Sequence, residues 1–357
     1  MKAITNTKLI MEDGIIFDGV LLFDNGIILA ADSADKVTIP TDCDVIDAGG
    51  KYTAPGLIDI HCHGAGEYWF YQNPQACSEH FISHGVTTLL PTFYMNMSLE
   101  EMIEGAEVIR KESKSGVCRI MDGLYMEGPY MRNGGSFRND FKWSHGIKTE
   151  EYEVLVDKLG GLPRIWAIDP ALTGIEKFMA YVHEKTPQAI FALGHSGATA
   201  EQCRKIAKYG VKVQTHHGDS GKAPGLAQGT IGAGCDEYTL YNPDMYAELI
   251  VDETGIHVVP DRVKLVVKTK GVERMILITD STITIEGYTN NEELGIAYGS
   301  DLNYDDEGRL AGSRLTLDNA CRNLMKHTGY GLCHAIRMAT ANPAKLLGID
   351  DKVGTLE

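Results

Sequence analysis

The sequence predicts an α/β protein in which a TIM-like (β/α)8 barrel follows a small β domain. The chain has 357 residues, and a barrel of this kind takes about 250, so one large and one small domain fit the length. After Pro55, short apolar runs alternate with helical stretches in eight units, the number that closes such a barrel. We therefore expect the barrel over residues 54–344 and the β domain over residues 1–53, with residues 345–357 joining the latter.

The N-terminal segment has the pattern of short strands joined by tight turns. The stretch "NTKLIMEDGIIFDGVLLFDNGIILAA" alternates apolar and polar residues and is broken by Asp-Gly and Asn-Gly pairs. These residues tolerate the left-handed backbone of two-residue turns, so the pairs predict hairpins.

The barrel units are assigned from the alternation of short apolar runs and helical stretches after residue 55. Each predicted strand is a short apolar run, and each predicted helix has apolar residues at helical spacing. We place the strands at 56–64, 86–93, 118–128, 164–172, 189–196, 211–219, 255–259 and 274–281. We place helices between them at 74–85, 98–113, 150–161, 174–186, 198–210, 242–252 and 261–271.

The composition argues against several classes of protein. A net charge of −16, without a basic patch, makes nucleic acid an improbable partner. The N-terminus lacks the apolar core of a signal peptide, and no run of about 18 apolar residues predicts a membrane span. The eight cysteines form no CxxC pair, so we expect free thiols and a cytoplasmic protein.

Residues that can bind a metal or transfer a proton follow six of the predicted strands. Because the carboxyl ends of barrel strands meet at one mouth, these side chains can surround a single point although they are far apart in the chain. They are His61 and His63 after the first strand, Glu127 after the third, His195 after the fifth, His216 after the sixth, His257 after the seventh and Asp280 after the eighth.

The first strand ends in "HCHG", residues 61–64. Alternation along a strand puts His61 and His63 on the same side and Cys62 on the other. One histidine at such a position is usually a packed core residue, but six strand ends carrying only His, Glu or Asp favour a metal site. His257 has no second ligand beside it, so we interpret it as a substrate contact.

A divalent cation held by these residues is suited to hydrolysis. Imidazole and carboxylate ligands suit Zn, Fe or Mn, and the number of ligands allows one ion or two. Such an ion lowers the pKa of bound water to about 7 and polarises a carbonyl oxygen. Asp280 is then the predicted general base, which takes the proton of the water and passes it to the leaving nitrogen.

Motifs over nearly the whole chain resemble the amidohydrolase superfamily and, within it, the N-acetylglucosamine-6-phosphate deacetylases. "EGPY", "GHSGAT" and "LAGSRLT" are similar to segments specific to these deacetylases. The resemblance implies an amidohydrolase-type barrel, a homodimer and a small N-acetylated sugar as partner. The remaining similar segments are "PGLIDIHCHG", "GLYMEGPYM", "DETGIHV", "LITDS" and "MATANPAKLLGI".

The resemblance also implies roles for single residues. Glu127, His195 and His216 would hold the main metal ion, and Glu127 would bridge to a second ion. Asp280 would be the catalytic acid/base. His61 and His63 would hold the second ion, and the substrate would contact His257, Ser313 and Leu315.

The chain departs from the family after the sixth strand. The family has Thr-His-Leu-Phe-Asn-Ala, whose Asn and Ala bind the sugar phosphate, whereas "THHGDS" puts Asp219 and Ser220 there. Two unit charges about 4 Å apart repel by roughly 4 kcal/mol at an effective dielectric constant of 20, so a carboxylate there disfavours a phosphate. Lys222 can offset this repulsion, and we expect all three residues to contact the substrate.

The sequence therefore predicts a metal-dependent amidohydrolase that removes the acetyl group from an N-acetylated amino sugar, with N-acetylglucosamine 6-phosphate as the leading substrate. One alternative is deacetylation of an unphosphorylated or differently substituted N-acyl amine, and another is the opening of a cyclic amide. A catalytically silent sugar-binding protein is a third alternative, but it would have lost a ligand or the base, and the sequence retains them all.

Overall fold

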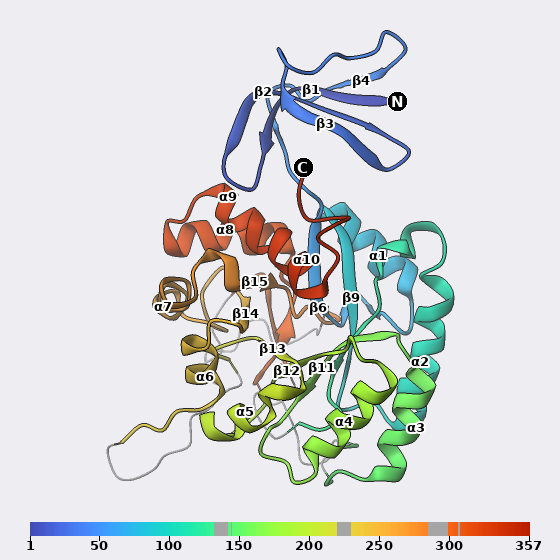
Figure 1. The fold of residues 1–357 in the computed structure, drawn as a ribbon, viewed down its shortest axis with the longest axis vertical. Helices are drawn as coiled ribbons and strands as arrows, with labels where there is room; N and C mark the ends of the chain where they lie inside the picture. The colour runs from blue at the N-terminus through green and yellow to red at the C-terminus, as the bar shows by residue number, and fades with distance from the viewer. Residues whose placement is uncertain (132–141, 144, 220–229, 285–298, 306–307) are drawn as a thin grey trace.

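An eight-stranded parallel sheet surrounded by helices forms most of the molecule, and a small β-sheet stands at one end of it (Figure 1). The predicted fold class is confirmed. Among the described residues, no helix combines the length and apolar character that crossing a membrane requires. The computed structural model describes residues 1–131, 142–143, 145–219, 230–284, 299–305 and 308–357.

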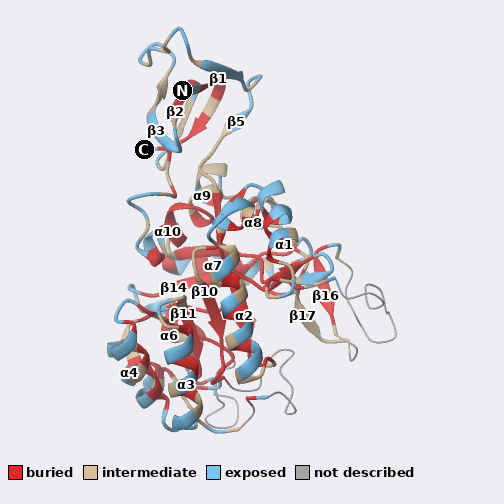
Figure 2. Ribbon diagram, turned by 90° about the vertical axis from the view of Figure 1, so that its right-hand side faces the viewer, coloured by how far each residue is buried: buried red, intermediate tan, exposed pale blue. Residues whose placement is uncertain are grey.

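The barrel strands are short apolar segments that are buried on both faces, because helices cover the outside and side chains fill the inside. Consecutive strands are parallel neighbours in the order of the chain. Figure 2 shows β10 and β14 buried among helices whose outer faces are exposed. The barrel strands are β6 (Leu57–Cys62), β9 (Val86–Tyr94), β10 (Leu124–Glu127), β11 (Pro163–Ile168), β12 (Ile190–Leu193), β13 (Val211–Gln214), β14 (Tyr246–Ile250) and β15 (Met275–Ile278).

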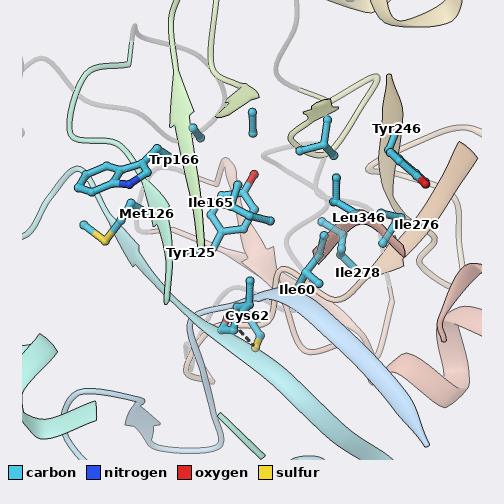
Figure 3. Close-up of a cluster of buried hydrophobic side chains, with 14 of the residues drawn as sticks. Ile60, Cys62, Tyr125, Met126, Ile165, Trp166, Tyr246, Ile276, Ile278 and Leu346 are labelled. Carbon is cyan, nitrogen blue, oxygen red and sulfur yellow. Dashed lines mark hydrogen bonds between the residues drawn. The ribbon is translucent and has the colours of Figure 1, made fainter. Parts of the chain in front are cut away.

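The helices pack an apolar face against these strands. In Figure 3, Ile276 and Ile278 of β15 lie beside Leu346 of a C-terminal helix. The helices are α1 (Pro74–Ser83), α2 (Leu99–Glu112), α3 (Thr149–Leu159), α4 (Ile175–Lys185), α5 (Ala200–Ile206), α6 (Cys235–Tyr241), α7 (Pro260–Lys270), α8 (Leu317–Thr328), α9 (Leu332–Met338) and α10 (Ala341–Leu347). Short 3-10 turns are η1 (Gly116–Ile120), η2 (Ala207–Tyr209) and η3 (Val272–Arg274).

The seventh unit differs from the prediction. The segment predicted as a helix at 242–252 contains the strand β14, and the predicted strand at 255–259 is a loop. All five residues of β14 are buried. A strand buried on both faces lacks the alternation that distinguishes it from a helix, so periodicity alone misassigned it.

The first and last barrel strands meet at a seam. The backbone N–H of Asp280 donates to the carbonyl oxygen of His61 at 2.9 Å. The carboxyl group of Asp59 accepts a hydrogen bond from the Thr279 hydroxyl at 2.7 Å, and burial raises the pKa of Asp59 to about 7. Two segments more than 200 residues apart in sequence are thus joined beside the predicted site.

The glycine-containing pairs of the small sheet have two different structural roles. Asn25 and Gly26 have φ values of 48° and 81° and form the predicted tight turn. The hairpin predicted at Asp18 and Gly19 is wrong: this pair lies within a strand, at an irregular register where a Cβ on residue 19 would collide with Leu9. The strands are β1 (Lys2–Ile10), β2 (Ile15–Asp24), β3 (Ile27–Ser33), β4 (Asp44–Asp47) and β5 (Tyr52–Thr53).

The C-terminal segment returns to the small sheet, where Leu356 packs with Leu9 and Leu21. The division of the chain after residue 53 remains our proposal. Two further pairs of short antiparallel strands lie on the barrel: β7 (Gly64–Ala65) with β8 (Tyr68–Trp69), and β16 (Leu302–Tyr304) with β17 (Leu310–Ser313).

Candidate metal centre

Six predicted site residues come together at the carboxyl ends of the barrel strands, where their side chains are almost completely buried. Three of them have an uncommon left-handed backbone: φ is 40° at His195, 24° at His216 and 48° at Asp280. Such a conformation costs on the order of 1 kcal/mol per residue and persists where surrounding contacts enforce it. The six residues are His61, His63, Glu127, His195, His216 and Asp280.

A close approach of two strands places His195. Its neighbour Gly194 lies against Thr215, and a Cβ on residue 194 would come within 2.7 Å of the Thr215 hydroxyl oxygen. Only glycine allows β12 and β13 to end this close together. His195 and His216, which follow these strands, consequently have ring centroids 4.9 Å apart.

Glu127, at the end of β10, is the centre of the cluster. Its Oε1 lies 3.0 Å from Nε2 of His195 and 3.1 Å from Nε2 of His216. Its Oε2 lies 3.4 Å from Nε2 of His63 and 3.9 Å from Nε2 of His61. One carboxylate thus faces four imidazoles, two on each oxygen.

Asp280 approaches the same cluster from β15. Its Oδ1 lies 3.0 Å from Nε2 of His63 and 3.5 Å from Nε2 of His61. The two histidines therefore point to one side of β6, as the alternation predicts. Cys62 between them packs in the hydrophobic core instead, with its sulfur 3.6 Å from the carbonyl oxygen of Leu90 (Figure 3).

Burial and pairing act in opposite directions on the charges of the cluster. Burial alone would raise the pKa of Glu127, but hydrogen bonds from His195 and His216 lower it well below its ordinary value. Burial alone would lower the pKa of His216, but its hydrogen bond to Glu127 raises it to about 9. The pKa of Asp280 is lowered, because its contacts with His63 and His61 outweigh burial. Both carboxylates are therefore negatively charged beside the imidazoles.

The donor set fits a divalent metal. Two groups of three residues, which share Glu127, each present ligand atoms within 4.8 Å of one another. Nε2 of His61 is buried and has no hydrogen-bond partner among the described residues, which is costly unless another group binds it. Nitrogen and carboxylate ligands of this kind suit Zn, Fe or Mn. The groups are His61, His63 and Glu127, and Glu127, His195 and His216.

His257 lies in the loop after β14 rather than on a strand. Its side chain is almost fully buried, and its Nδ1 is 3.4 Å from a carboxylate oxygen of Asp252. Burial alone would lower the pKa of His257, but Asp252 raises it. Asp252 also accepts the backbone N–H of His257 at 2.9 Å, so this carboxylate holds the loop backbone at His257.

The predicted substrate-binding residues have different surroundings. Asp219 lies beside the cluster, with Oδ2 3.9 Å from Nδ1 of His216 and a partly exposed side chain. Ser313 is buried, and its hydroxyl donates to the carbonyl oxygen of Thr279 at 2.6 Å and accepts the N–H of Leu315 at 3.0 Å. The Leu315 side chain lies in the hydrophobic core. Ser220 and Lys222 lie outside the described residues.

Sequence reasoning missed Glu248. Its carboxylate is completely buried in β14 and lies 3.2 Å from Nδ1 of His61. A lone acidic residue inside the apolar run "YAELIV" is a signal that could have found it, because a buried carboxylate is rare without a partner. Because β14 was predicted as a helix, Glu248 was not placed among the residues at the mouth of the barrel.

An eight-stranded parallel barrel with histidines and carboxylates at the carboxyl ends of its strands defines the class of metal-dependent barrel hydrolases. The model of the amidohydrolase family matches residues 52–357. The chain belongs to this family.

Individual proteins are similar over nearly the full length. The N-acetylglucosamine-6-phosphate deacetylase of Haemophilus influenzae is 26% identical over 99% of this chain and 92% of its own length. The N-acetylgalactosamine-6-phosphate deacetylase of Escherichia coli O157:H7 is 28% identical over 98% and 90%. The crystal structure of N-acetylglucosamine-6-phosphate deacetylase from Pasteurella multocida covers 100% of this chain and 92% of its own, with a TM-score of 0.84 and 24% identity.

Proposed function

We propose that this chain hydrolyses the acetamide bond of an N-acetylated amino sugar, with N-acetylglucosamine 6-phosphate as the preferred substrate. The observation that carries this proposal is the single carboxylate of Glu127, placed between four imidazoles next to Asp280. The similarity to deacetylases of two 6-phosphorylated N-acetylhexosamines supports the class of substrate.

In this proposal the five ligands are His61, His63, Glu127, His195 and His216, and they hold one or two divalent ions, Zn, Fe or Mn. When bound, the ion supplies Lewis acidity toward the amide carbonyl and the attacking water. Asp280 accepts the proton of that water at a carboxylate oxygen and transfers it to the amine nitrogen as the C–N bond breaks. Its lowered pKa leaves it ionised, as a proton acceptor must be.

His257 supports the reaction by contacting the substrate. Neither ring nitrogen has a hydrogen-bond partner among the described residues, but Nδ1 lies 3.4 Å from the Asp252 carboxylate, so Nε2 is the nitrogen left for a substrate. This buried nitrogen can bind an oxygen of the sugar or of its substituent. Ser313 positions the backbone of Asp280, since the N–H of Ser313 donates to the Asp280 carbonyl oxygen at 2.9 Å.

A second candidate substrate is an N-acyl amine without a phosphate. The carboxylate of Asp219 favours it, because this negative charge lies beside His216 in the position where the resembling family binds the phosphate. A hydroxyl group there could donate a hydrogen bond to the carboxylate, whereas a phosphate would be repelled.

Acetate release from a substrate panel at matched metal loading distinguishes these candidates. The panel contains the 6-phosphates of N-acetylglucosamine and N-acetylgalactosamine and the two free sugars. We expect the highest kcat/KM for N-acetylglucosamine 6-phosphate. A preference for the free sugars would support the second candidate, and absence of acetate release from the whole panel would refute deacetylation of amino sugars.

Three further properties belong to the proposal. We propose a homodimer, to be checked by light scattering, and metal analysis of the purified protein will identify the ion. The described cysteines carry no disulfide, which agrees with the proposed cytoplasmic location.

A further inference from the structure

We propose that Glu248 is a positioning residue of the metal centre, which sets the orientation and the tautomer of His61 and holds the backbone of His216. The proposal rests on the metal centre described under the proposed function. It adds a residue from the seventh barrel strand to a centre whose other residues follow five different strands.

One oxygen of Glu248 contacts both halves of the centre. Oε2 lies 3.2 Å from Nδ1 of His61 and 3.2 Å from the backbone nitrogen of His216. His61 belongs to one group of three candidate ligands and His216 to the other. A single buried atom therefore fixes the relative position of the two groups.

The contact with His61 determines which of its nitrogens faces the centre. A carboxylate oxygen can only accept, so Nδ1 of His61 carries a hydrogen and donates it to Glu248. Nε2 then points toward Glu127 and Asp280, and no described residue forms a hydrogen bond with it. The ring of Tyr125 packs at a centroid distance of 4.4 Å and limits rotation of the imidazole. Pairs of a carboxylate and a metal-binding histidine commonly work in this way.

The contact with His216 supports a strained backbone. The φ of His216 is 24°, which is sterically unfavourable for a residue with a side chain. The N–H of His216 donates to Glu248, so a charge-assisted hydrogen bond holds this conformation. Loss of the acceptor would leave both the N–H of His216 and Nδ1 of His61 without this partner.

Packing alone does not explain a glutamate at this position. Glu248 is completely buried, its strand neighbours Ala247 and Leu249 are apolar, and its Oε1 has no hydrogen-bond partner among the described residues. An apolar side chain would avoid the desolvation of a carboxylate. A residue that is unfavourable for folding and that contacts two candidate ligands is expected at a functional site.

The test compares zinc binding by the full-length protein and three variants, measured by competition with a chromophoric chelator. Glu248→Leu removes the acceptor, and we expect about 10-fold to 100-fold weaker zinc binding, the range typical for partners of metal-binding histidines. Glu248→Gln keeps an acceptor oxygen but loses the charge, so we expect an intermediate loss. Glu253→Gln is the matched control, because it makes the same substitution at an exposed glutamate that contacts Ser300 rather than a candidate ligand, and we expect no change.

A spectroscopic measurement reports the tautomer directly. Long-range ¹H–¹⁵N spectra of the zinc-loaded wild-type protein should show the Nδ1 of His61 protonated and Nε2 bound. Zinc on Nδ1 would overturn the proposal even if Glu248→Leu fails to fold. Unchanged zinc affinity of Glu248→Leu would overturn it while leaving the metal centre intact. Failure of the wild type to bind zinc, iron or manganese would refute the metal centre and this proposal together.

Discussion

Charged side chains gather in two very different ways at the barrel mouth and at the junction between the barrel and the small sheet. At the mouth, Glu127 and Asp280 are buried among imidazoles, and no lysine or arginine of the described part of the chain pairs with them. At the junction, Glu12 lies 2.7 Å from the ammonium of Lys345 and 3.0 Å from the guanidinium of Arg337. The junction therefore balances its charge with permanent cations of the chain.

This difference separates a functional cluster from a structural one. Imidazoles can give up their protons, so the mouth can exchange protons for a metal ion without leaving an unpaired cation of its own. Among the described residues, the partners of Glu12 at the junction are a lysine and an arginine rather than imidazoles. Changes at the mouth should therefore alter metal content and turnover, whereas changes at the junction should alter stability.

The largest effect is expected for Glu127→Ala, because Glu127 belongs to both candidate ligand groups. We expect loss of bound metal and of most of the catalytic acceleration, on the order of 10⁶-fold in kcat/KM. Metal analysis and acetate release measure the two losses. Circular dichroism must show a folded variant, and a folded Glu127→Ala protein with full metal content would contradict the role of Glu127.

Asp280→Asn should have the next largest effect. The amide cannot accept the water proton, so we expect kcat to fall by about 10²-fold to 10⁴-fold while metal remains bound. Kinetics and metal analysis on the same preparation are required. If the variant loses its metal, Asp280 acts mainly as a ligand.

Asp219→Asn tests whether the charge beside the barrel mouth affects binding of a phosphorylated sugar. Removal of the negative charge should lower KM for the 6-phosphorylated sugar by about tenfold, the equivalent of 1.4 kcal/mol, and leave the free sugar unchanged. Steady-state kinetics with both sugars provide the internal control. An equal or higher KM for the phosphorylated sugar would show that Asp219 does not face the phosphate.

Glu12→Gln should have the smallest effect, and on stability alone. The hydrogen bond from Lys345 lowers the pKa of Glu12 below 4.5, so its stabilisation is present above that value and lost as the pH falls through the lowered pKa. We expect a loss of about 0.5 to 1 kcal/mol in the free energy of unfolding at neutral pH. Urea denaturation at neutral and acidic pH measures it. A difference that persists at acidic pH, or reduced turnover, would contradict this assignment.

The sequence predicted the barrel and most residues of the cluster at its mouth, because the carboxyl ends of the strands converge whatever the sequence between them. Alternation was sufficient to place His61 and His63 on one side of β6. It could not find Glu248, since a strand buried on both faces has no alternation and was read as a helix. The left-handed backbone of His195 and His216 could not be predicted from the sequence either, because contacts distant in sequence impose it.

The seam at Asp59 and Thr279 has a consequence for the synthesis of the protein. The backbone of His61 and that of Asp280 are bonded to each other there, so the barrel cannot close until the eighth strand has been made. A chain still emerging from the ribosome therefore lacks the complete cluster, and we expect any shortened product that ends before residue 280 to be inactive. The candidate catalytic groups can all come together only when the two ends of the barrel meet.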